Sequence, residues 1–266
     1  EGDLERRLKW LRSGGGELPE TQDALRKIRA ARQRFSRVIG LFPNLTWDGA
    51  IAERDRFFAG LEDWLLQTIR FAGENDIFVV VREHPQPPEH YDRVESVLSM
   101  LSDIDADLLQ APHVLTVGAL ERVNSHALGA ELDSCVMYNG TLIVEFSHLG
   151  HPVIVAGNSP FNNKGVGFEP ESREAYFDLL KRMSSGDAEF QDRKNQFQTN
   201  AIRAAAFQYI YNIYHFPIMP QLTDWTFDSE KYWKSWNNRP DDLDPAKNVE
   251  WARTIDRIAA EAGSVT

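Results

Sequence analysis

The stretch SCVMYNGTLIVEFSHLGHPVIVAG, residues Ser134–Gly157, decides the predicted fold of this chain. It opens with a short apolar run, Ser134–Tyr138, of the kind that is buried in a parallel sheet. Asn139-Gly140-Thr141 then supplies turn and helix-capping residue types. Leu142–Leu149 has helical spacing, and a glycine and a proline separate it from a second apolar run, Val153–Ala156. The stretch therefore predicts strand, turn, helix and strand.

The same alternation precedes this stretch. Apolar runs predict three earlier strands, and amphipathic segments between them predict helices. The strands are expected at Val38–Phe42, Ile77–Val81 and His113–Val117, with helices at about Arg54–Ala72 and Tyr91–Ser102 and a short segment around Ala119–Leu128. Five strands in alternation with helices predict an α/β fold with a parallel, doubly wound, Rossmann-like sheet and right-handed crossovers.

Extensions are expected on both sides of this sheet. Residues 1–36 predict a helical lead-in, with helices at about Leu4–Leu11 and Glu20–Ser36 around a glycine-rich linker. We therefore divide the chain into a lead-in (1–36), a Rossmann-like domain (37–190), and a long helix with a C-terminal tail (191–266).

The part after the fifth strand begins with a polar, glycine-rich loop, Asn158–Phe168, which we expect to lie outside the core. Helices are expected at about Ser172–Ser184 and Phe190–Tyr214. The tail from Pro217 is rich in tryptophan, and we expect these aromatic side chains to strap the tail onto the domain. They are Trp225, Trp233, Trp236 and Trp251.

Composition narrows the function classes. The net charge of −11 argues against a nucleic-acid partner, so any phosphate would be held by a local site. No apolar run approaches the ~20 residues that a membrane span needs, and residues 1–12 lack the apolar region of a signal peptide. The single cysteine, Cys135, fits a reducing compartment. We expect a cytoplasmic location or the inner face of the inner membrane.

Three loops follow the carboxyl ends of predicted strands: Pro43–Ala50, Arg82–Gln86 and Asn139–Thr141. In a doubly wound sheet these ends line one edge, so the loops can converge. The amides of Gly140 and Thr141 would lie at a helix N-terminus, where unpaired N–H groups and the helix dipole favour a phosphate. The alternative is that Gly-Thr is only the punctuation before a helix.

The sequence predicts four further residues of this site. Glu145, in the first turn of the helix, could accept hydrogen bonds from ribose hydroxyls or simply complement the helix dipole. Pro85 fixes the backbone after His84, whose imidazole could donate to a phosphate oxygen. Arg82 lies two residues earlier and could reach the same anion. The alternatives are a structural His-Pro turn and an arginine paired with a nearby glutamate.

Five segments in this order resemble the capsule polysaccharide biosynthesis and export family. They are LFPNLTWDGA, LEDWLLQTI, VVVREHPQP, NGTLIVEFSHLGHPVIVAG and FEPESREAYFDLL, and the likeness spans about Val38–Leu180. That family includes proteins similar to Kdo transferases, and its nucleotide-binding half resembles the C-terminal domain of GT-B glycosyltransferases. The His-Pro motif is also similar to that of bacterial sialyltransferases and CDP-glycerol glycerophosphotransferases.

The resemblance implies roles for individual residues. His84 and Pro85 would lie near the donor nucleotide and its phosphate, the Asn139–Thr141 turn would contact the phosphate, and Glu145 the ribose or sugar. The polar residues of the first loop that would face the cleft are Asn44 and Thr46. Where relatives have a Ser-Tyr pair, this chain has Ser125-His126, which could contact the base or the donor.

The catalytic base is harder to assign. The acidic-acidic-Gly motif of the sialyltransferase-like enzymes has no match, and Asp48 is the best candidate within the chain, with capping of the next helix as the alternative. The chain resembles the donor-binding half of a larger transferase, or a compact homologue. The resemblance implies that 37–190 is a nucleotide-sugar-binding domain and that the long helix of 191–266 is the crossover helix. His148 and His151 have no carboxylate that would complete a metal set, so neither a metal nor another cofactor is expected.

Three functions are compatible with these residues. The first is a GT-B glycosyltransferase that moves a sugar, Kdo or a sialic-acid-like sugar, from a CMP donor onto a polysaccharide or glycolipid acceptor in capsule or surface polysaccharide synthesis. The second is a glycerophosphotransferase that uses a CDP-glycerol donor. The third is a non-catalytic nucleotide-sugar-binding module of an export machine, associated with that complex or with the membrane surface.

Overall fold

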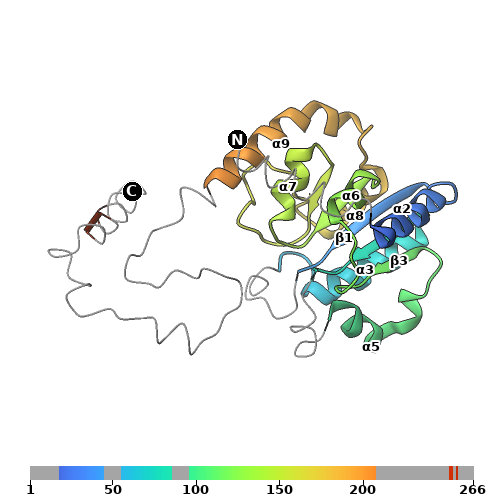
Figure 1. Cartoon of the computed structure of the whole chain (residues 1–266). Helices are drawn as coiled ribbons and strands as arrows, with labels where there is room; N and C mark the ends of the chain where they lie inside the picture. The colour runs from blue at the N-terminus through green and yellow to red at the C-terminus, as the bar shows by residue number, and fades with distance from the viewer. Residues whose placement is uncertain (1–17, 45–54, 86–95, 208–251, 254–255, 257–266) are drawn as a thin grey trace, which may run out of the picture. The chain divides into compact units, whose positions relative to one another are not determined.

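A computed structural model describes residues 18–44, 55–85, 96–207, 252, 253 and 256 (Figure 1). Its centre is a five-stranded parallel sheet in the order β3-β2-β1-β4-β5. The strands are β1 (Arg37–Phe42), β2 (Ile77–Arg82), β3 (Val114–Val117), β4 (Ser134–Met137) and β5 (Val153–Val155). This strand order confirms the predicted α/β, Rossmann-like class. The chain divides into two units, Glu1–Ala205 and Ala206–Thr266, and the sheet belongs to the first.

One face of the sheet is covered by α3 (Leu61–Glu74), α5 (Val97–Leu109) and α8 (Arg173–Arg182). Trp64, in α3, is fully buried and donates a hydrogen bond of 2.8 Å from Nε1 to the Tyr176 hydroxyl. The same hydroxyl lies 2.9 Å from Thr68 Oγ1, so the polar atoms of this core are paired with one another.

The opposite face is covered by α2 (Pro19–Ala31), α6 (Ser125–Ala130) and α7 (Leu142–Leu149). Ile28 of α2 and Phe146 of α7 are fully buried there, so α2 is part of the same core. Helix α9 (Ala188–Ala206) contributes residues to both faces. Because both faces are covered, β1 and β2 are almost wholly apolar rather than alternating.

The predicted element boundaries agree best where a backbone signal is local. Helix α7 begins and ends at the predicted residues, and Gly150 ends it with φ +78°. Helix α3 begins later than predicted, at Leu61, because Gly60 precedes it with φ +128°. Helix α5 begins after Ser96, whose side chain accepts a hydrogen bond from the Ser99 amide, and it continues to Leu109.

The prediction for the glycine-rich loop 158–168 is wrong. This loop has no regular structure, yet Phe161, Val166 and Phe168 are buried in the core. Phe168 also forms a parallel bridge with Ile154 of β5. The loop therefore closes one side of the domain, and its polar Ser159 is also buried and donates to Asn162 Oδ1 at 2.7 Å. The four predicted tail tryptophans lie outside the described residues.

Candidate functional site

The carboxyl ends of β2, β1 and β4 meet at one edge of the sheet. In the parallel register, Leu41 of β1 pairs with Val81 of β2 and with Val136 of β4. The three strands end at Phe42, Arg82 and Met137, so Asn44, His84 and Asn139 each lie two residues beyond a strand end. The three sequence-predicted residues therefore follow strand ends at one edge of the sheet, with β1 in the middle and the outer two strands roughly 10 Å apart.

This edge includes the topological switch point of the sheet, between β1 and β4. Successive strands run outward from β1 to β2 and β3 on one side, and β4 and β5 lie on the other. In open α/β sheets, ligands bind outside the carboxyl ends of the strands at this point. Asn44 and Gly140 follow the two strands that flank it.

Gly140 begins the turn into α7 with φ +112°, a conformation that side-chain-bearing residues rarely adopt. A Cβ placed on Gly140 would lie 3.5 Å from Asn44 Nδ2, so the two residues are close neighbours. The Gly140 amide donates to the Asn139 side-chain oxygen at 2.7 Å. This corrects the prediction that the amide is unpaired, because Asn139 satisfies it locally.

The side-chain oxygen of Asn44 forms no hydrogen bond with the described residues. Its Oδ1 is buried and has no hydrogen-bond partner among them. The other two predicted residues of this first loop, Thr46 and Asp48, lie outside the part of the chain that the structure describes.

Arg82 has a different environment from the predicted one. Its side chain is buried, and its guanidinium donates to three backbone carbonyls, those of Gly118, Glu121 and Val123, at 2.6, 3.3 and 3.1 Å. Burial lowers the pKa of Arg82 to about 10, against the opposing effect of Glu121 and Glu83, so the group stays charged at neutral pH. These three bonds anchor the loop after β3 and use both terminal nitrogens of the guanidinium, whereas its buried Nε has no hydrogen-bond partner among the described residues.

Glu83 is a residue that sequence reasoning missed. Its buried carboxylate accepts hydrogen bonds from Leu98, in the first turn of α5, at 2.8 Å and from Ala119 at 2.9 Å. A charged residue at the end of an apolar strand, directly after Arg82, was the available signal. Arg82 and Glu83 together fix the chain just before His84 and Pro85, both of which are exposed.

Glu145 is also buried, and it is paired. His126 Nε2 of α6 lies 2.9 Å from Glu145 Oε2 of α7, and both side chains are at most 6% exposed. Of the predicted pair Ser125-His126, His126 makes this contact. Ser125 is the first residue of α6 and is half-buried. The contact between positions 126 and 145 was not predicted.

Tyr138, the residue after β4, forms a hydrogen bond with a carboxylate near the same edge. Its hydroxyl donates to Asp55, in the segment that precedes α3. Burial raises the pKa of Tyr138, and the hydrogen bond to Asp55 adds to this shift. The Trp64 ring packs against Tyr138 with centroids 5.4 Å apart, so the tyrosine is held from both sides.

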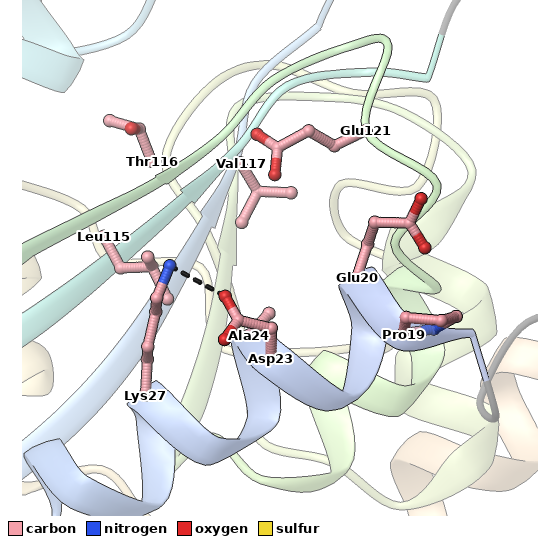
Figure 2. A pocket seen from close by; sticks show the side chains of 9 residues that line it. All are labelled: Pro19, Glu20, Asp23, Ala24, Lys27, Leu115, Thr116, Val117 and Glu121. Carbon is pink, nitrogen blue, oxygen red and sulfur yellow. Dashed lines mark ion pairs between the residues drawn. The ribbon is translucent and has the colours of Figure 1, made fainter.

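A groove of about 270 Å³ lies elsewhere, between α2 and the edge strand β3 (Figure 2). Lys27 of α2 points toward Asp23 there and forms an ion pair of 2.9 Å with it. None of the predicted site residues lines this groove. Its lining consists of Pro19, Glu20, Asp23, Ala24, Lys27, Leu115, Thr116, Val117 and Glu121.

The residues that the structure describes contain neither a metal-binding cluster nor a membrane-spanning helix. Within them, no group of three or more His, Cys, Asp and Glu side chains could hold a metal ion, and this includes His148 and His151. None of the described helices is long and apolar enough to cross a lipid bilayer.

No protein-family model and no curated protein matches the sequence. Solved structures show distant similarity to enzymes with a GT-B-like fold. The wall teichoic acid polymerase TagF has 15% identity and a TM-score of 0.43 over 71% of this chain and 46% of that chain. A co-structure of S. aureus MnaA with UDP has 12% identity and a TM-score of 0.41 over 69% and 48%.

The beta Kdo 2,7 transferase KpsC of Thermosulfurimonas dismutans has 16% identity and a TM-score of 0.35 over 67% of this chain and 57% of that chain. The chain thus spans about half the length of these three proteins. Its fold class rests on the strand order of its own sheet.

Proposed function

We propose that this chain binds a nucleotide sugar as the donor-binding part of a GT-B-type glycosyltransferase, with a CMP-linked sugar such as Kdo or a sialic-acid-like sugar as the donor. The observation that supports this proposal is the switch point between β1 and β4, beside which Gly140 and Asn44 are close neighbours. Sheets of this kind bind nucleotides at that edge. The ordered motifs that resemble capsule polysaccharide enzymes support the choice of donor.

The proposal gives chemical tasks to the start of α7, to His84 and to Glu145. The N-terminus of α7 and the Thr141 amide attract the donor phosphate, because the helix dipole favours an anion there. His84 donates a hydrogen bond to the phosphate that leaves with the electron pair of the broken bond, and its protonated form adds charge. Glu145 accepts a hydrogen bond from a ribose hydroxyl. The acceptor is a polysaccharide or glycolipid.

Calorimetric titration with CMP, CDP, UDP and GDP tests the proposal. We expect CMP to bind most tightly, and His84→Ala to weaken it by about 10- to 100-fold, the value of a charge-assisted hydrogen bond. His113→Ala is the matched control, because His113 bonds the Ile69 carbonyl and precedes β3, at the opposite edge of the sheet.

The outcomes separate the alternatives. Preference for CDP over CMP would replace the sugar donor by a CDP-glycerol donor. Absence of binding for all four nucleotides would contradict the proposal. Binding of CMP without turnover of a CMP-sugar, in the presence of a polysaccharide acceptor, would identify a binding module rather than a transferase.

A further inference from the structure

The outer side of β3 has backbone groups that pair with no described strand. Strand β3 stands at one end of the strand order, with β2 as its neighbour. The Val79 amide donates to the His113 carbonyl at 2.8 Å, just before β3. The Glu83 amide donates to the Val117 carbonyl at 3.0 Å. Because the direction of the peptide groups alternates along a strand, Thr116 between them directs its N–H and C=O away from β2.

The groove of Figure 2 lies directly beside this edge, between β3 and α2. It has a volume of about 270 Å³, and its apolar lining includes Ala24, Leu115 and Val117. A strand added to β3 would lie about 4.8 Å beyond it, and its side chains would point alternately to the two faces of the sheet. Every second side chain would therefore point to the α2 face, over the groove.

The groove has more carboxylates than cations. Three carboxylates line it, those of Glu20, Asp23 and Glu121, and Lys27 is the basic residue among the lining residues. Lys27 already forms an ion pair of 2.9 Å with Asp23. Figure 2 shows Glu20 and Glu121 on the side of the groove away from Lys27. Glu121 is also fixed in place, because its Oε1 accepts a hydrogen bond from the Gly118 amide at 2.6 Å.

These charges determine which segment fits the edge. Two copies of this chain joined through β3 would place the same carboxylates near one another, and like charges across a strand pair are destabilising. Positive side chains are complementary to Glu20 and Glu121. On the other face of β3, α5 exposes 46% of Ile104, so apolar side chains are complementary there.

We propose that the β3 edge and its groove bind an extended basic segment of a partner protein. The backbone of this segment bonds the N–H and C=O of Thr116 and adds one strand to the sheet. Every second side chain is Lys or Arg and reaches the carboxylates of Glu20 and Glu121. The side chains between them are apolar and lie on the α5 face. This surface lies at β3, whereas the nucleotide site is proposed at the switch point between β1 and β4, so the inference does not depend on the proposed function.

The first test concerns the backbone pairing. Fluorescence anisotropy measures binding of the labelled peptide Lys-Val-Lys-Val-Lys-Val to the full chain at low ionic strength. Thr116→Pro removes the outward N–H at a position where an edge strand tolerates proline, and it is expected to weaken binding by about 3- to 10-fold. Thr116→Val keeps the backbone groups and should bind like wild type. In wild type, the peptide should protect the Thr116 amide from hydrogen exchange.

The second test concerns the charges. Glu20→Gln combined with Glu121→Gln is expected to weaken binding by about 2- to 30-fold, because two exposed ion pairs are lost. The matched control is Glu62→Gln combined with Glu171→Gln, which changes the net charge equally at exposed positions that do not line the groove. This control should leave binding unchanged. The peptide Glu-Val-Glu-Val-Glu-Val should not bind wild type.

Several results would overturn the proposal. Wild type that does not bind the basic peptide, or that binds it without protection of the Thr116 amide, contradicts the added strand. Equal weakening in the two double variants would show only a general attraction to a chain of net charge −11.

Two further results would name a different occupant and so also contradict a partner protein. Binding that appears only after the basic residues of the lead-in are changed to glutamine would identify the chain's own lead-in; these residues are Arg6, Arg7, Lys9 and Arg12. A dimer in sedimentation that Thr116→Pro dissociates would identify a second copy of the chain.

Discussion

The guanidinium of Arg82 lies 2.6 Å from the carbonyl oxygen of Gly118 and also bonds two later carbonyls of the same loop. The sequence predicted that Arg82 could bind an anion, whereas in the structure it binds backbone carbonyls. Its neighbour Glu83 holds the Ala119 amide of that loop and the start of α5. The four residues Arg82-Glu83-His84-Pro85 therefore combine two buried anchors with two exposed residues.

Arg82→Met is expected to lower the free energy of unfolding by about 2 to 5 kcal/mol, because it removes a buried guanidinium that donates to three backbone carbonyls. Urea unfolding followed by tryptophan fluorescence measures this change. Arg29→Met is the control, since Arg29 forms an exposed ion pair with Glu131 and its loss should have little effect. Equal effects of the two substitutions would refute the anchoring role of Arg82.

Gly140→Ala should reduce stability by about 1 to 2 kcal/mol and weaken CMP binding, because alanine is strained at φ +112° and the turn before α7 would shift. Thermal unfolding and calorimetry measure the two effects. Gly186→Ala serves for comparison, since a Cβ there would meet only Ser184 Oγ, at 3.9 Å. An unchanged melting temperature in Gly140→Ala would show that the turn adapts without strain.

Tyr176→Phe removes the hydroxyl that pairs with Trp64 Nε1 and Thr68 Oγ1 in the core. We expect a loss of about 1 to 3 kcal/mol, because the indole N–H is left buried and unpaired. Tyr138→Phe should cost less, since its partner Asp55 is exposed and can be solvated by water. Chemical denaturation of both variants decides the order, and the reverse order would contradict this explanation.

We also expect the free energy of unfolding to fall in alkaline solution because of Tyr176. Burial raises the pKa of its hydroxyl above the ordinary value of 10, so above that pH the unfolded chain releases a proton that the folded protein keeps. The folded state then loses about 1.4 kcal/mol for each further pH unit. The difference in unfolding free energy between wild type and Tyr176→Phe should therefore shrink from pH 9 to pH 11. A constant difference would exclude ionisation of Tyr176 as the cause.

The sequence predicted the sheet well because each strand is a short apolar run with a local boundary signal. Strands β1 and β2 are buried on both faces, and α7 ends at a glycine with positive φ. The polar contacts were harder, because they depend on which loop packs where. Arg82 meets carbonyls 36 to 41 positions later, and no local pattern specifies such a partner.

Two other predictions were wrong for different reasons. In the first, a neighbouring side chain competes with a ligand for a backbone amide, and in the second, a polar composition conceals buried residues. The Gly140 amide has two candidate partners, a ligand and the side chain of Asn139, and only the coordinates show that Asn139 is bonded. The loop 158–168 has the composition of a solvent-exposed segment. Its three buried apolar residues are spaced irregularly, so no helix or strand period identifies them.

The bridge of Phe168 to β5 determines how this sheet could grow. The Val155 amide bonds the Phe168 carbonyl, and the Phe168 amide bonds the Val153 carbonyl, so the outer rim of β5 is already occupied by the chain itself. Edge strands without such cover are templates for pairing with another polypeptide. Lateral extension of the sheet, in a crystal or in a larger assembly, is therefore expected along β3 and not along β5.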